Sequence, residues 1–135
     1  MAIFGQASLA QLATVDQRLQ KILVAALAHT DFSVIEGHRG QAAQHQAFLN
    51  GTSQLDWPHG SHNADPSRAV DLAPYPLDWS DKTTALARFT FLGGVIKVIA
   101  DQMNIKVRFG WDWNRNLDPR DEKFLDWGHL ELDEP

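Results

Sequence analysis

Two histidines and two aspartates, placed in two short polar segments, are the residues best suited to chemistry in this chain. His62 and Asp71 bound the segment His62-Asn-Ala-Asp-Pro-Ser-Arg-Ala-Val-Asp71, and Asp126 and His129 bound Asp126-Trp-Gly-His129 farther along. Two imidazoles and one carboxylate can hold a Zn²⁺ ion and leave a fourth position open for water, while the second carboxylate takes a proton from that water. The pattern indicates a metal-dependent hydrolase.

The composition narrows the possible classes of protein. A length of 135 residues suits one compact domain over 1–135, and the lack of cysteine excludes disulfides, thiolate zinc sites and a cysteine nucleophile. A net charge of −5 without a stripe of lysines and arginines disfavours nucleic acid as a partner. The first residues lack the features of a signal peptide, and the longest apolar run, Ile22 to Ala28, is too short to cross a membrane. We therefore expect neither a signal peptide nor membrane insertion.

Hydrophobic periodicity predicts helices and strands in a mixed order. The helical patterns cover 8–29, as one broken or continuous helix with Ser8 or Thr14 as a cap, then 41–49, and 80–102, where Gly93-Gly94 weakens the middle. The strand patterns cover 32–37, 68–73, 105–109 and 129–132, and a turn-rich loop covers 52–66. This order predicts an α+β fold, with a small antiparallel sheet flanked by helices.

The predicted strand around Asp71 decides where its carboxylate points. Because side chains alternate along a strand, Val70 and Leu72 share the core face and Asp71 lies on the other face. His129 and Glu131 likewise share one face of the last strand. If the two strands are neighbours, Asp71 and His129 can meet.

Each of these residues, taken alone, also has an ordinary structural interpretation. His62 could be a polar loop histidine, and Asp71 could be a buried hydrogen-bond acceptor, although a buried carboxylate without a partner is costly. His59 lies three residues before His62, but a loop gives that spacing no fixed ligand geometry. His29, at the end of the first helix, and His45, within the second, are expected to be structural or solvated.

Several motifs together resemble the zinc peptidases of the D-Ala-D-Ala carboxypeptidase/VanY type. In chain order they are Glu36-Gly-His-Arg39, Gln44, the run His-Asn-x-x-Pro-Ser-x-Ala-Val-Asp-Leu from His62 to Leu72, Gly110-Trp-Asp-Trp113 and Asp126-Trp-Gly-His-Leu-Glu-Leu132. The resemblance extends from about Val15 to Leu132 and, within these peptidases, is greatest to single-domain phage endolysins that cleave the L-alanyl-D-glutamate bond of peptidoglycan. It implies a fold like that of hedgehog domains and D-Ala-D-Ala peptidases.

The resemblance also implies a role for each residue of the metal site. His62, Asp71 and His129 would be the Zn²⁺ ligands, and Asp126 would be the general base. Glu131 remains an alternative, because it could orient a histidine ligand or replace Asp126 as the base.

Substrate contacts are implied on the same grounds. Arg39 would hold a substrate carboxylate or the oxyanion, since its guanidinium presents a fork of donors, and Gln44 would support it. His38, next to Arg39, is a candidate for the lining of the cleft. Trp113 is a candidate wall of the substrate groove, as are Trp111 and Trp127, although large aromatic residues more often belong to the core. Asp112 could be either a structural cap or a substrate contact.

The expected function is that of a zinc-dependent peptidoglycan peptidase of a phage. It would work as a monomer on the stem peptide, stored in the host cytoplasm and acting in the periplasm or cell wall after release. A D-Ala-D-Ala carboxypeptidase or dipeptidase using the same site is one alternative. A non-catalytic wall-binding domain is another, because hedgehog-type signalling domains share the fold. The metal ligands and the base Asp126 argue against the second alternative.

Overall fold

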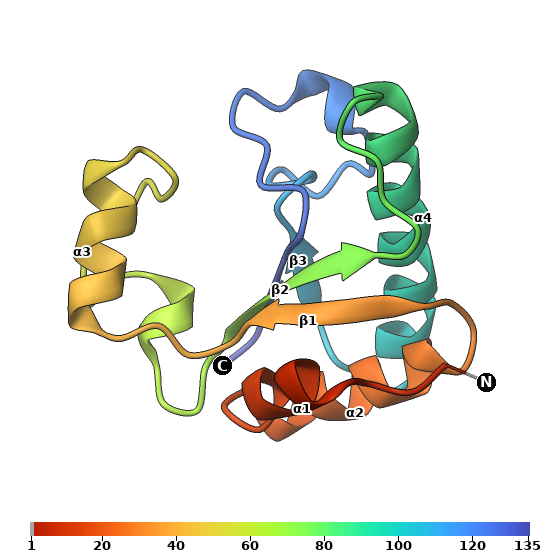
Figure 1. The fold of residues 1–135 in the computed structure, drawn as a ribbon, viewed down its shortest axis with the longest axis horizontal. Helices are drawn as coiled ribbons and strands as arrows, with labels where there is room; N and C mark the ends of the chain where they lie inside the picture. Colours follow the sequence, from red (N-terminus) through yellow and green to blue (C-terminus); the bar gives the residue numbers. More distant parts are fainter. Residues whose placement is uncertain (1) are drawn as a thin grey trace.

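A four-stranded antiparallel sheet with the order β1-β2-β4-β3 forms the centre of the computed structural model, which describes residues 2–135 (Figure 1). The strands are β1 (Phe32–Glu36), β2 (Ala69–Pro74), β3 (Val107–Phe109) and β4 (His129–Leu132). The helices are α1 (Gln6–Leu12), α2 (Gln17–Leu27), α3 (Gln41–Leu49) and α4 (Lys82–Gln102), with 3₁₀ turns η1 (Ser61–Asn63) and η2 (Pro119–Asp121). The predicted α+β class is confirmed.

The helical pattern over 8–29 forms two helices. Asp16 caps α2, because its side chain accepts a hydrogen bond from the amide of Arg18 at 2.9 Å. The linker between the helices is tied to Ser67, whose backbone bonds both Thr14 and Asp16 at 2.8 Å. The proposed caps were therefore wrong: Ser8 lies inside α1, and Thr14 lies in the linker.

The Gly93-Gly94 pair does not interrupt α4. A Cβ atom on Gly93 would lie 2.8 Å from the ring of Trp111, so the glycine makes room for this packing contact. The helix begins at Asp81, whose side chain accepts a hydrogen bond from the amide of Thr84. By length and composition alone α4 could cross a membrane, but a core helix of a folded domain passes the same test, and α4 supplies seven buried residues.

The core lies between the sheet and the helices α1, α2 and α4. Its buried side chains come from all three helices, all four strands and the linker between α1 and α2. The largest of those with almost no exposed surface are Val15, Leu19, Ile22, Leu23, Val70, Ile96 and Leu130. Burial of this apolar set stabilises the sheet as a rigid platform.

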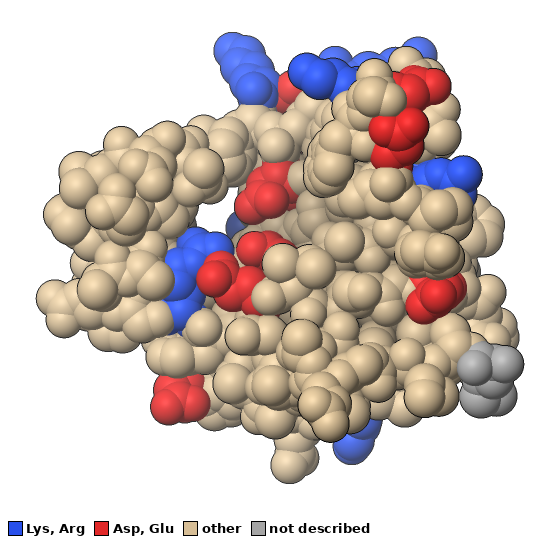
Figure 2. Space-filling model, viewed as in Figure 1, with Lys and Arg blue, Asp and Glu red and all other residues tan. Residues whose placement is uncertain are grey.

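Helix α3 stands apart from this core, on the far side of the sheet from α4 (Figure 1). The space-filling view shows a hollow between the lobe that contains α3 and the body of the protein (Figure 2). Basic atoms lie on one side of the hollow and acidic atoms on the other. Some of the charged groups on this face of the molecule thus lie where the two parts meet.

Candidate metal centre and active-site cleft

The register of the sheet brings two of the predicted ligands together. Asp71 on β2 lies directly opposite His129 on β4. A bulge between Val34 and Glu36 in β1 places Glu36 opposite Asp71 on the other side. One row across the sheet therefore carries Glu36, Asp71 and His129.

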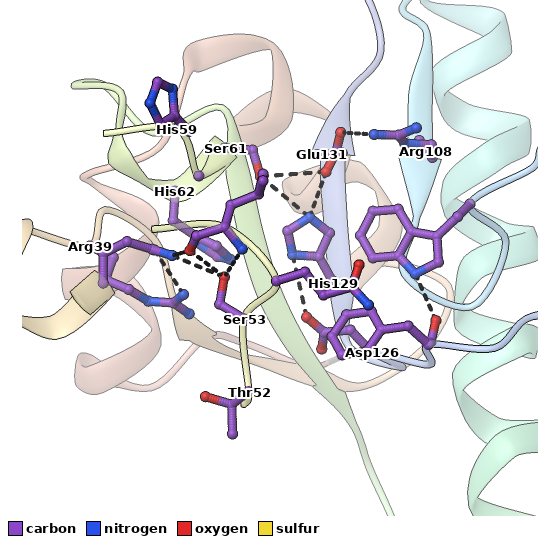
Figure 3. A pocket seen from close by; sticks show the side chains of 16 residues that line it. Arg39, Thr52, Ser53, His59, Ser61, His62, Arg108, Asp126, His129 and Glu131 are labelled. Carbon is purple, nitrogen blue, oxygen red and sulfur yellow. Dashed lines mark hydrogen bonds and ion pairs between the residues drawn. The ribbon is translucent and has the colours of Figure 1, made fainter. Parts of the chain in front are cut away.

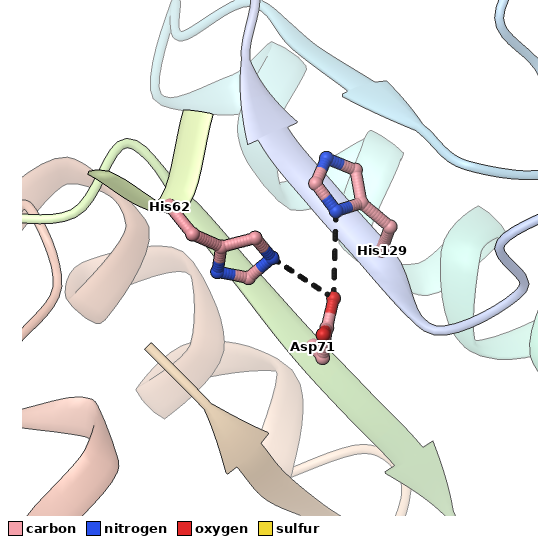
Figure 4. A group of neighbouring side chains, drawn as sticks. All are labelled: His62, Asp71 and His129. Atoms are coloured by element: carbon pink, nitrogen blue, oxygen red, sulfur yellow. Dashed lines mark hydrogen bonds and ion pairs between the residues drawn. The ribbon is translucent and has the colours of Figure 1, made fainter. Parts of the chain in front are cut away.

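The third predicted ligand, His62, comes from η1, which packs against β2 (Figure 4). Its ring is buried, and Nδ1 donates a hydrogen bond to the carbonyl of Gly37 at 2.7 Å. Because a carbonyl only accepts, this bond places a proton on Nδ1 and turns Nε2 toward Asp71. The backbone amide of Arg39 also donates to the carbonyl of His62, which holds η1 against the end of β1.

The donor atoms of the three residues converge with the spacing of a zinc site. Nε2 of His62 lies 3.2 Å and Nδ1 of His129 lies 3.4 Å from Oδ1 of Asp71, and all the ligand atoms lie within 4.8 Å of one another (Figure 4). Ligands about 2.0–2.1 Å from a tetrahedral zinc ion are themselves about 3.3 Å apart. Two nitrogens and one carboxylate oxygen, with no sulfur, also suit Zn²⁺.

Each histidine has its second ring nitrogen engaged. Nε2 of His129 lies 2.8 Å from Oε1 of Glu131, and Oε2 of Glu131 accepts a hydrogen bond from Nη2 of Arg108 at 2.8 Å. The guanidinium of Arg108 lies over the ring of Trp113, 5.1 Å from its centroid, and Trp113 packs against His129. Such partners fix the orientation of a metal-binding histidine.

The electrostatics of the cluster favour a positive charge at its centre. Burial alone would raise the pKa of Asp71, but its interactions with His129 and His62 outweigh burial and hold this pKa well below its usual range. Burial would lower the pKa of His129, but its bonds to Asp71 and Glu131 raise it to about 9. A cation bound here would replace that proton and receive the same stabilisation.

Asp126 lies beside the cluster with one face open to solvent. Its Oδ2 is 3.7 Å from Nδ1 of His129, and its amide donates to the carbonyl of Gly110, which fixes the loop before β4. Burial and the negative charge of Asp71 raise the pKa of Asp126. A carboxylate with a raised pKa is a better proton acceptor, so this position suits a general base.

A cavity of about 440 Å³ opens in front of these groups (Figure 3). Its walls come from α3 and the loop after it, from η1, from β3 and β4, and from the segment before β4; the lining residues are Arg39, Gln44, Thr52, Ser53, Gln54, Leu55, His59, Gly60, Ser61, His62, Arg108, Trp113, Phe124, Asp126, His129 and Glu131. The cavity thus joins two of the three predicted metal ligands, His62 and His129, with the predicted base and two arginines in one space.

Arg39 is held in place between the lobe and the sheet. Its guanidinium pairs with Glu36, donates to Oε1 of Gln44 at 3.1 Å and lies 3.6 Å from Oδ2 of Asp71. Gln44 is buried, accepts a second hydrogen bond from Asn63 and donates to the loop after α3. Gln44 therefore helps to hold the guanidinium of Arg39 in its position in the cavity.

Other predicted site residues lie elsewhere. His38 turns Nδ1 toward the carbonyl of Ala64, 3.0 Å away, and is not among the described residues that line the cavity. Trp111 belongs to the core, where it stacks on Phe109. Asp112 is buried, and its carboxylate accepts hydrogen bonds from two backbone amides of its own loop, which is a structural role.

Arg108 is a charged residue of the cavity that was not predicted from the sequence. It lies opposite Glu131 in the register of β3 and β4, so its charge meets a carboxylate across the sheet. The sequence did contain one indication of this position. In the predicted strand, Arg108 lies between the apolar residues Val107 and Phe109, and this alternation places Arg108 on the face away from the core.

Comparisons with known proteins show the family of this chain and the fold of a solved structure similar to it. The family model for phage L-alanyl-D-glutamate peptidase matches residues 1–133. The L-alanyl-D-glutamate peptidase of Escherichia phage T5 is 38% identical over 137 aligned positions, which cover 96% of each protein. The crystal structure of the Serratia marcescens L-Ala D-Glu endopeptidase ChiX has the same fold, with a TM-score of 0.69 and 24% identity over 96% of this chain and 90% of that one. The chain belongs to the phage L-alanyl-D-glutamate peptidase family.

Proposed function

We propose that this protein is a zinc-dependent endolysin that hydrolyses the L-alanyl-D-glutamate bond in the stem peptide of peptidoglycan. The observation that carries the proposal is the convergence of His62, Asp71 and His129 beside Asp126, in a cleft of a chain that matches the peptidase family over 1–133. In this proposal the enzyme is made in the host cytoplasm and reaches the wall after release.

His62, Asp71 and His129 would hold the metal through Nε2, a carboxylate oxygen and Nδ1. When bound, Zn²⁺ supplies Lewis acidity, which lowers the pKa of a bound water to about 7 and polarises a carbonyl. Asp126 accepts the proton of the attacking water at Oδ2 and passes it to the leaving amine. Its raised pKa suits the first step, because a carboxylate with a higher pKa holds a transferred proton more readily.

Arg39 and Arg108 give the cavity a cationic rim, which suits the carboxylates of the stem peptide on the D-glutamate side of the bond. Arg39 is the proposed substrate contact, because its guanidinium lies 3.6 Å from Oδ2 of Asp71, one of the residues that would hold the metal. In this arrangement Arg39 orients the substrate over the metal ligands, and Gln44 keeps the guanidinium in position.

Digestion of purified peptidoglycan, with the released fragments identified by mass, tests the proposal. We expect fragments that end at L-Ala and fragments that begin at D-Glu, and far slower release of both with the Asp126→Asn variant. Release of free D-Ala without a cut after L-Ala would instead assign a carboxypeptidase. Binding to the wall without any cleavage would assign a non-catalytic domain.

A further inference from the structure

A second cavity, of about 610 Å³, lies beside the candidate metal ligands. Asp126 lines both cavities, and Asp71 lines the second one while His62 and His129 line the first. The lining residues of the second cavity are Ile35, Asp71, Leu72, Ala73, Leu77, Trp79, Lys82, Phe89, Leu125, Asp126, Trp127 and Gly128. The candidate metal ligands and Asp126 therefore border two spaces, each large enough for part of a substrate.

The two spaces differ in chemistry. The first is polar and carries Arg39 and Arg108, whereas the second is mostly apolar and aromatic, with Lys82 as the one cation among its described lining residues. Its aromatic wall is formed by Trp79, which stacks on Trp127 at 5.6 Å with an interplanar angle of 18°. Phe89 packs against both tryptophans from α4 and supports the stack.

Trp79 is the exposed member of this stack, with 58% of its surface open to solvent. One face of its ring stacks on Trp127. This contact fixes the orientation of the indole, which still remains accessible to a ligand. A rigid and exposed tryptophan at the rim of a cavity is a contact surface for a ligand with a flat apolar face.

We propose that the second cavity is a sugar subsite, in which the muramic acid residue that bears the stem peptide packs against Trp79. This inference rests on the proposed function. On one side of the L-alanyl-D-glutamate bond the substrate carries carboxylates, which match the cavity with Arg39 and Arg108. On the other side it carries the methyl group of L-Ala and the amino sugar of the glycan strand, whose pyranose ring has apolar C–H faces. Charge complementarity thus assigns the sugar to the aromatic cavity.

The length of the substrate agrees with this assignment. A single residue, L-Ala, separates the scissile carbonyl from the lactyl group of the sugar, and an extended residue spans only about 3.3–3.6 Å. The sugar must therefore bind directly beside the reacting centre. The second cavity opens there, because Asp71 and Asp126 form part of its wall.

The test compares two substrates that differ only in the sugar: muramyl-L-Ala-D-Glu-diaminopimelate and the same tripeptide without muramic acid. We expect the wild-type protein to cleave the sugar-bearing substrate with a kcat/KM at least about tenfold higher, a factor that corresponds to about 1.4 kcal/mol. Trp79→Ala should remove this preference, mainly by raising KM for the sugar-bearing substrate, and should leave cleavage of the free tripeptide unchanged. Trp79→Phe should keep most of the preference, because it retains an aromatic face.

Phe91→Ala is the matched control, since Phe91 is similarly exposed, at 63%, but lies outside the lining of both cavities. Thermal denaturation checks that each variant is folded. Equal cleavage of the two substrates by the wild type, or an equal loss on both substrates in Trp79→Ala, overturns the sugar subsite while the peptidase function stands. Failure of the wild type to cut either substrate at this bond overturns the proposed function, and the subsite with it.

Discussion

Glu131 and His129 point from the same face of β4, and Oε1 of Glu131 lies 2.8 Å from Nε2 of His129. The bond leaves Nδ1 of His129 directed at Asp71 and Asp126. The other carboxylate oxygen of Glu131 is engaged by Arg108. This arrangement supports Glu131 as the group that orients a metal ligand and Asp126 as the base.

Replacement of Glu131 with Gln should weaken zinc binding by roughly 10- to 100-fold, because the amide orients His129 less firmly and does not raise its basicity. Competition with a chromogenic chelator measures the affinity. Asp101→Asn, at an exposed carboxylate near the end of α4, is the control and should bind zinc like the wild type. An unchanged affinity in Glu131→Gln would remove the orienting role.

Replacement of Asp126 with Asn should keep the bound zinc and lower kcat by a factor on the order of 10²–10⁴, because it removes the proton acceptor without touching a ligand. Metal analysis and steady-state kinetics on the same preparation separate the two effects. If this variant digests peptidoglycan at a near-normal rate while zinc-saturated Glu131→Gln does not, Glu131 is the base.

Replacement of Arg39 with Lys should lower kcat/KM even though the charge is kept. Lysine cannot reproduce the guanidinium fork, and the loss of charge-assisted hydrogen bonds corresponds to roughly 1.5–3 kcal/mol. The variant also lacks the hydrogen bond from the guanidinium to Gln44. Thermal denaturation shows whether this loss lowers the stability of the fold. An unchanged kcat/KM would make Arg39 a structural residue.

The pairing of Asp71 with His129 was predictable because alternation along each strand places both side chains on the face away from the core. The sequence pattern did not establish that the two strands are neighbours, since strand order depends on contacts between distant segments. For the same reason Arg108 was missed: its partner Glu131 is 23 positions away and meets it only through the register of β3 and β4.

Helix boundaries were less predictable than the site. The apolar stripe over 8–29 continues through the linker because Val15 is buried in the same core as the helices, so periodicity alone does not reveal the break. The break is formed by hydrogen bonds to Ser67, far along the chain. Gly93 resembled a weak point in α4, but the reason for the glycine is the ring of Trp111, which is brought there by tertiary packing.

A substitution at Gly110 tests whether close packing against this glycine fixes the segment that carries Asp126. It changes no charged group. A Cβ atom at Gly110 would lie 2.0 Å from the carbonyl oxygen of Asp126, so Gly110→Ala must displace the segment that carries the base. We expect a loss of stability of about 1–3 kcal/mol together with lower activity. Gly94→Ala is the control: nothing lies within 4 Å of its Cβ position in α4, and alanine there should leave stability unchanged or raise it by up to about 1 kcal/mol. Equal stability of the two variants in thermal denaturation would contradict this account.

The most direct test of the central claim is a zinc titration of the metal-free protein, with cleavage at the L-alanyl-D-glutamate bond as the readout. Cleavage should be absent after removal of metal, rise in proportion to added zinc and level off at about one ion per chain. His62→Ala should neither bind zinc tightly nor regain activity. His59→Ala is the control, because His59 lines the same cavity but is not one of the candidate ligands, and this variant should bind zinc like the wild type. Full cleavage by the metal-free protein, or by His62→Ala without bound zinc, would contradict the account.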